Sequence, residues 1–167
     1  MNFPMLAAEN SEGRRFMLPQ DFEGAYNVVV ITFQQRQQSD VETWLPLLHR
    51  LSSHYEALHH YVLPTIQFLS DCQHEFLDVS ANFRLSAQRP FANTLRLYVD
   101  LNDFNRALDI PTVSQIYTFL LDSSGRVLWR ASGAYNPDCA HDLINLLDRL
   151  YPAPAAQRVL SVPQFHS

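Results

Sequence analysis

The chain has 167 residues, 47% hydrophobic and 12% aromatic, which is enough to bury the core of one globular domain and too apolar for a disordered chain. Its formal net charge is −5 and its pI about 5.7, which exclude a basic surface for nucleic acid or an anionic membrane. All twelve basic residues are arginine, and the absence of lysine excludes Schiff-base chemistry and a P-loop lysine.

The N-terminal residues contain no charged region followed by a long apolar run, so we expect no signal peptide. No apolar run approaches the roughly 18 residues that a membrane-spanning helix needs. Two cysteines far apart form neither a C-x-x-C motif nor a zinc pattern, which suits a reducing compartment. We therefore expect a cytoplasmic protein without a membrane span.

The first strongly patterned segment is a strand that runs into amides. Phe16 to Leu18 is a short strand candidate, and residues 26–33 are almost wholly apolar, which predicts a central strand buried on both faces. The segment QQRQQ follows at once, and then Ser39 to Glu42 fits an S-x-x-E capping box. This box predicts a helix over residues 40–58, facing the core with Val41, Leu45, Leu48 and Leu51 or Ser52.

Two prolines modify the elements that follow. Pro46 lies about two turns inside the predicted helix, where it removes a hydrogen bond and should kink the helix. Residues 60–68 read as a second strand, in which Pro64 favours an edge position or an irregular end.

The second half of the chain alternates helices and strands. Residues 70–86 have the period of an amphipathic helix, residues 94–99 alternate as a strand, and Asn102 should cap a short helix to residue 108. The remaining elements are a hairpin of residues 116–121 and 126–129 around the turn Asp122-Ser-Ser-Gly125, a helix opened by Asn136-Pro137 and ending at Leu150, and an extended tail over residues 152–167.

This element order predicts an α/β fold. A strand–helix–strand half followed by a hairpin and a last helix makes a central mixed β-sheet flanked by helices on both faces, a three-layer sandwich. No repeat or linker divides it, so we expect one domain over residues 1–151, with its core at about 14–151.

Two segments carry a family resemblance: FMLPQDFEG (residues 16–24) with NVVVITF (27–33), and TFLLDSSGRV (118–127), with Gly133 before the last helix. They resemble the opening and the hairpin of the thioredoxin-like superfamily, in the form used by peroxiredoxins and membrane-tethered thiol reductases. WLPLLHRL (44–51) and IYTFLLDSSGRVLWRASGAYNPD (116–138) are similar to mitochondrial ATP-synthase assembly factors of this fold. That second resemblance implies a role as a chaperone for partner proteins.

The resemblance also implies where a redox site would lie. In thioredoxins the kinking proline follows the first redox cysteine by eight residues, which assigns that cysteine position to Gln38 and the second to Val41. The hairpin motif assigns the family's cis-proline to Ile116, with Pro111 five residues earlier. We therefore treat Gln37, Gln38, Ser39, Asp40, Val41 and Ile116 as a vestigial site, because none of these side chains can exchange a disulfide.

The two thiols are weak catalytic candidates. Cys139 lies in the first turn of the last helix, where a thiolate is favoured, but His141 two residues on would not face it. Cys72 lies near another helix start, beside acidic groups that raise a thiol pKa. We interpret both as structural cysteines.

Other polar and aromatic residues give no stronger signal. The spacing of His49, His54, His59 and His60 around a helix predicts scattered surface imidazoles, and we expect neither a metal site nor a cofactor. Arg36, Asp40 and Glu42 fit a solvated helix start or a polar pocket. Trp44 and Trp129 fit packing residues or partner anchors.

Two functions remain open. The first is a redox-inactive, non-enzymatic module that binds another protein in assembly or chaperoning, with a homodimer as one arrangement left open. The alternative is a thiol-dependent oxidoreductase or peroxidase with its chemistry relocated to Cys139 or Cys72. A third, small-ligand binding at the helix N-terminus over residues 37–41, has only the free N–H groups in its favour.

Overall fold

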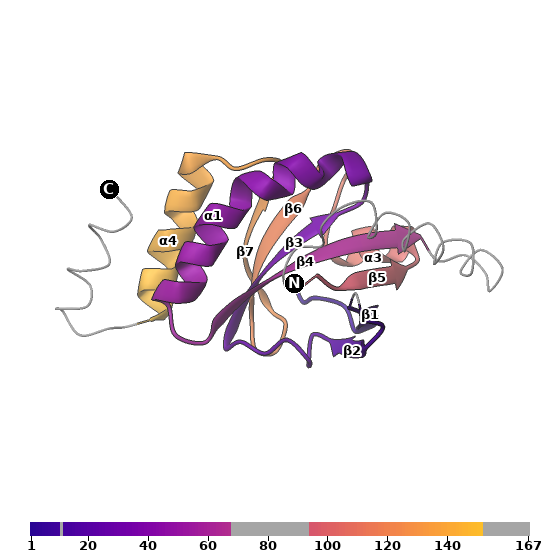
Figure 1. Cartoon of the computed structure of the whole chain (residues 1–167), viewed down its shortest axis with the longest axis horizontal. Coiled ribbons are helices and arrows are strands. Elements are labelled where there is room, and N and C mark those ends of the chain that lie inside the picture. The colour runs from indigo at the N-terminus through magenta and orange to yellow at the C-terminus, as the bar shows by residue number, and fades with distance from the viewer. Residues whose placement is uncertain (11, 68–93, 152–167) are drawn as a thin grey trace.

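The structure, a computed structural model, describes residues 1–10, 12–67 and 94–151 of the chain (Figure 1). In these ranges seven strands form one mixed sheet in the order β2-β1-β5-β4-β3-β6-β7. The strands are β1 (Leu6–Glu9), β2 (Arg15–Leu18), β3 (Tyr26–Thr32), β4 (Leu58–Gln67), β5 (Arg96–Val99), β6 (Tyr117–Asp122) and β7 (Val127–Ser132). A 3-10 turn, η1 (Gln35–Gln37), precedes α1 (Gln38–His54), and α3 (Leu101–Ala107) and α4 (Pro137–Leu150) are the other helices of the described residues.

A β3–α1–β4 crossover forms the centre of the sheet. β3 pairs in parallel with β4 and antiparallel with β6, and all its residues after Tyr26 are buried, so the predicted burial on both faces is confirmed. The hairpin of β6 and β7 also follows its prediction. Its turn closes with Gly125 at a φ of 89°, and the Asp122 carboxylate accepts from the backbone N–H groups of Ser124 and Arg126, each at 2.9 Å.

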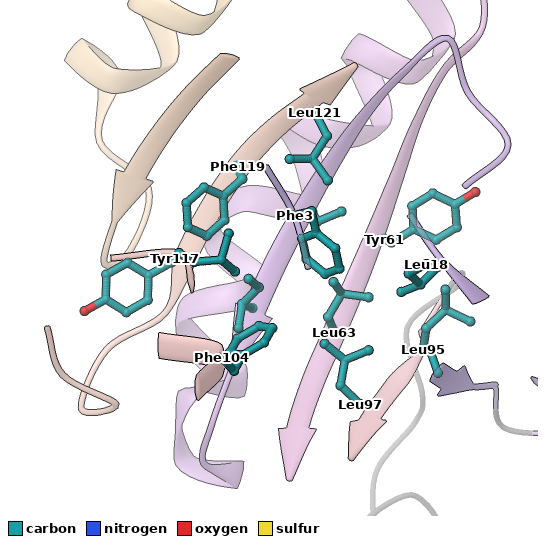
Figure 2. Close-up of a cluster of buried hydrophobic side chains, with 14 of the residues drawn as sticks. Phe3, Leu18, Tyr61, Leu63, Leu95, Leu97, Phe104, Tyr117, Phe119 and Leu121 are labelled. Atoms are coloured by element: carbon teal, nitrogen blue, oxygen red, sulfur yellow. The ribbon is translucent and has the colours of Figure 1, made fainter. Parts of the chain in front are cut away.

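The two faces of the sheet bury separate hydrophobic clusters. α1 and α4 lie side by side over one face (Figure 1), and their apolar sides pack with alternate residues of β3 and β6. On the other face, Figure 2 shows side chains of β4, β5 and β6 together with Phe3 and Phe104. Phe3 anchors the N-terminal segment there, with its ring edge-to-face against Phe22 (5.8 Å) and Phe104 (6.2 Å).

Two expectations about elements are wrong, and one strand was not predicted. β4 is the middle strand of the sheet rather than an edge strand. Pro64 is tolerated there because it is the last residue of β4 that pairs with β3, while pairing of β4 with β5 begins at Thr65. The N–H that Pro64 lacks therefore falls where β4 changes partners. α3 begins at Leu101, and its cap is Asp100 rather than Asn102, since the Asp100 carboxylate accepts from Asp103 N–H at 3.2 Å. β1 has no counterpart among the predicted elements.

Helix α1 contains Pro46 as expected, and it changes direction along its length (Figure 1). The predicted helix over residues 70–86 and the tail over residues 152–167 lie outside the described residues. The single-domain organisation stays a prediction.

Candidate functional site

Gln37 ties the end of β3 to the start of α1. Its side chain is buried, and its carbonyl oxygen accepts from the backbone N–H groups of Phe33 (2.8 Å) and Gln34 (3.1 Å). Its amide nitrogen donates to the carbonyl of Val113 at 2.9 Å, in the loop before β6. The predicted capping box at Ser39 is wrong, because α1 already begins at Gln38 and Ser39 is an exposed residue inside it. One amide therefore satisfies two strand-end donors and one loop acceptor.

Apolar packing occupies two of the three positions that the resemblance assigned to redox chemistry. Val41 and Ile116 are fully buried and belong to the same hydrophobic cluster as Trp44. The third position, Gln38, is half-buried at the first turn of α1. A thiol-exchange centre needs a sulfur that a partner's disulfide can reach. Neither the residue types nor the burial at these positions supply one.

The loop between α3 and β6 is held at three points. The Tyr117 hydroxyl donates to the carbonyl of Thr112 at 2.8 Å, and Gln37 donates to Val113. The Arg130 guanidinium donates to the carbonyls of Leu108 (2.8 Å) and Asp109 (3.1 Å). In the part of the chain that the structure describes, Leu18–Pro19 is the cis peptide bond, so the bond before Pro111 is trans and no cis-proline precedes β6.

The loop between β7 and α4 is equally well anchored and presents an aromatic side chain. Trp44 Nε1 donates to the carbonyl of Gly133 at 3.0 Å, and the Thr43 hydroxyl accepts from the N–H of Tyr135 at 2.9 Å. The Tyr135 ring packs edge-on against Trp44 at 5.5 Å while the residue stays 41% exposed. Trp44 is a packing residue, and Trp129, half-buried, packs against it at 6.2 Å.

The other candidate residues are not gathered into a site. The Arg36 side chain bonds to the Gln34 amide, and among the described residues no ion pair joins it to Asp40 or Glu42. Cys139 is a free thiol, half-buried against the hydrophobic cluster that lies between the sheet and helices α1 and α4, and His141 near it is exposed. Cys72 lies outside the described residues.

The histidine prediction was wrong in one respect. His60, on β4, is buried, and its ring lies 5.0 Å from that of His49 on α1. The Ser52 hydroxyl lies 2.7 Å from His60 Nδ1. Burial, reinforced by the nearby His49 and His59, lowers the pKa of His60 to about 4. Residues of two elements meet here, which spacing along one helix could not reveal. Within the described ranges no three His, Cys, Asp or Glu residues converge as metal ligands.

None of the helices within residues 1–10, 12–67 and 94–151 is long and apolar enough to cross a membrane.

No protein-family model and no curated protein sequence matches the chain. A solved thiol:disulfide interchange protein from Bacteroides sp. has a TM-score of 0.57 and 16% identity, over 92% of this chain and 90% of that one. StoA from Bacillus subtilis gives 0.53 and 12%, over 84% of this chain and 94% of that one. The exposed lipoprotein thioredoxin Etrx1 from Streptococcus pneumoniae TIGR4 gives 0.53 and 11%, over 84% and 97%.

The chain therefore has a thioredoxin-like α/β fold, as the sequence predicted, and two of these similar structures are described as a thiol:disulfide interchange protein and a thioredoxin. At such low identities the likeness concerns the fold alone. The resemblance to ATP-synthase assembly factors stays a prediction.

Proposed function

We propose that this chain is a redox-inactive thioredoxin-like protein that binds another protein, in an assembly or chaperone-like role. The observation that carries the proposal concerns the three positions that the resemblance assigns to a redox site. Val41 and Ile116 are packed into the core, and a glutamine stands at position 38. A glutamine amide cannot become the thiolate that disulfide exchange and peroxide reduction require.

The anchored loops support a binding role. Gln37, Tyr117 and Arg130 hold the loop before β6, and Trp44 and Thr43 hold the loop before α4. A preorganised surface loses little conformational entropy on binding. Tyr135 presents an exposed ring with a polar tip on one of these loops, a side chain type enriched in protein interfaces.

The test is a thiol assay. Purified protein should reduce neither insulin disulfides nor hydrogen peroxide above the uncatalysed rate, and Cys139→Ser and Cys72→Ser should leave that background unchanged. Turnover that disappears in Cys139→Ser or Cys72→Ser would instead establish the relocated-thiol alternative.

A cytoplasmic location is part of the proposal, supported by two cysteines without a C-x-x-C or zinc pattern. Etrx1, of the same fold, is described as an exposed lipoprotein, so the fold itself does not decide the compartment. Fractionation of cells carrying the tagged chain checks this point, and recovery in a membrane or exported fraction would refute it.

A further inference from the structure

The outer edge of β7 leaves backbone groups unpaired. In the antiparallel pair of β6 and β7, Gly133 N–H donates to the carbonyl of Ile116 at 2.8 Å, while Arg130 and Ser132 lie opposite Phe119 and Tyr117. Successive residues of an antiparallel strand direct their backbone N–H and C=O groups alternately toward one neighbouring strand and toward the other side. Since Gly133 bonds to β6, the N–H and C=O groups of Arg130 and Ser132 point away from β6. Among the described residues no hydrogen-bond partner reaches them.

An extended segment already pairs with the beginning of this edge. Val127 N–H donates to the carbonyl of Met1 at 2.9 Å, and Phe3 N–H donates to the carbonyl of Gly125 at 2.7 Å. These bonds flank an antiparallel bridge between Asn2 and Arg126. The pairing stops opposite Val127, and the open edge continues in the same line to Ser132. The edge therefore has the geometry to accept an antiparallel strand collinear with the N-terminal segment.

The opposite edge of the sheet differs. β2 has four residues, and the Asp21 carboxylate accepts from the N–H of Met17 at 2.6 Å. A side chain that occupies an edge donor blocks the addition of another strand. The β7 edge has no such block over Arg130 to Ser132 in the described structure.

The positive charge along the β7 edge favours an acidic partner. Residues 125–137 contain Arg126 and Arg130 and no acidic residue, although the chain as a whole has a net charge of −5. The Arg130 guanidinium donates to two neutral carbonyls and lies over the Phe119 ring at 5.1 Å, and the described residues provide it with no carboxylate. An acidic side chain on an added strand would complement this charge.

We propose that the open edge of β7 binds an extended, acidic segment of a partner protein as an additional antiparallel strand. The strand hydrogen-bonds to Arg130 and Ser132, places a carboxylate beside Arg130, and places apolar side chains on the opposite face beside Trp129. The inference rests on the proposed binding function and names its surface and its partner class. Strand addition of this kind takes affinity from main-chain hydrogen bonds and specificity from alternate side chains.

The probe is a labelled, end-capped hexapeptide that alternates valine and glutamate, titrated into the full chain at low salt. We expect saturable binding with amide-exchange protection at Arg130 and Ser132. Methylating the two peptide amides that donate to Arg130 and Ser132 should weaken binding about 30-fold, since each lost hydrogen bond contributes about 1 kcal/mol. Replacing glutamate by lysine should also abolish most of the binding.

The matched variants are Ser132→Pro, which removes an outward N–H, and Ser132→Ala, which keeps it. Peptide binding should fall about fivefold only in Ser132→Pro, and the methylated peptide gives the same information if that variant does not fold. Equal binding of the lysine peptide, or a wild-type dimer that Ser132→Pro dissociates, would overturn the proposal. If the peptide does not bind and no thiol turnover is found, strand addition at the β7 edge is refuted and the proposed function is not. Thiol turnover, in contrast, refutes the proposed function.

Discussion

At the scale of the residue, Gln37 stabilises the junction between β3 and α1. Its amide bonds to Phe33 N–H, Gln34 N–H and the Val113 carbonyl while buried. In Gln37→Ala these groups lose their partner, so the free energy of unfolding should fall by about 2–3 kcal/mol in urea titration. Gln35→Ala, at an exposed position in the same turn, should change it by less than about 0.5 kcal/mol. Equal effects would contradict the assigned role of Gln37.

Thr118 is the converse case, a buried polar group without a partner. Its residue is fully buried on β6, and its hydroxyl has no hydrogen-bond partner in the described structure. Thr118→Val keeps the shape and removes the unsatisfied hydroxyl, so it should raise the free energy of unfolding by about 1 kcal/mol. Thr118→Ala also removes the hydroxyl but leaves a cavity, and it should lower stability relative to Thr118→Val. A less stable valine variant would indicate that the hydroxyl has a partner in solution.

At the scale of elements, the packing of α1 on β4 should depend on pH through His60. The pKa of His60 is about 4 in the folded chain against 6.5 unfolded, so as pH falls below 6.5 the unfolded state binds the proton first. Stability should therefore be constant above about pH 6.5 and fall by roughly 1–3 kcal/mol by about pH 4.

His60→Gln removes the titrating group and keeps a side chain able to bond to Ser52. Denaturant titrations at several pH values should show a flatter dependence between pH 4 and 6.5 in this variant than in the wild type. If the unfolding free energy depended on pH equally steeply in both proteins, carboxylates and the other imidazoles would account for the acid sensitivity.

The elements that sequence reasoning predicted are those with local signals. β3 has an unbroken apolar run, α4 has Asn136 and Pro137 at its start, and the β6–β7 turn has its glycine. β1 was missed because LAAE is short and has little strand propensity, and it is a strand only because β2 and β5 flank it. The Gln37–Val113 bond joins residues 76 positions apart, so no local pattern could have revealed it.

At the scale of the whole molecule, the chain has a thioredoxin-like fold, and a glutamine and a valine stand at the two positions that the sequence resemblance assigns to redox cysteines. A solved structure of similar fold is a thiol:disulfide interchange protein, and this chain has Gln38 and Val41 at the start of α1. If the fold alone positions and activates a thiol, introducing two cysteines at these positions should confer thiol chemistry. Gln38→Cys combined with Val41→Cys tests this, because positions three apart on a helix lie on the same face.

The new thiol at position 38 should have a pKa below the ordinary value of about 8.5, because it would lie at the positive dipole end of α1. Ultraviolet titration of the thiolate gives that pKa, and a mass loss of about 2 Da on oxidation reports a disulfide between the two positions. The matched control, Glu42→Cys combined with Leu45→Cys, has the same spacing one turn further along, where the N–H groups are bonded within the helix. Equal thiol pKa values in the two variants would show that the start of α1 no longer activates a thiol, and that more than the cysteines separates this chain from the oxidoreductases of its fold.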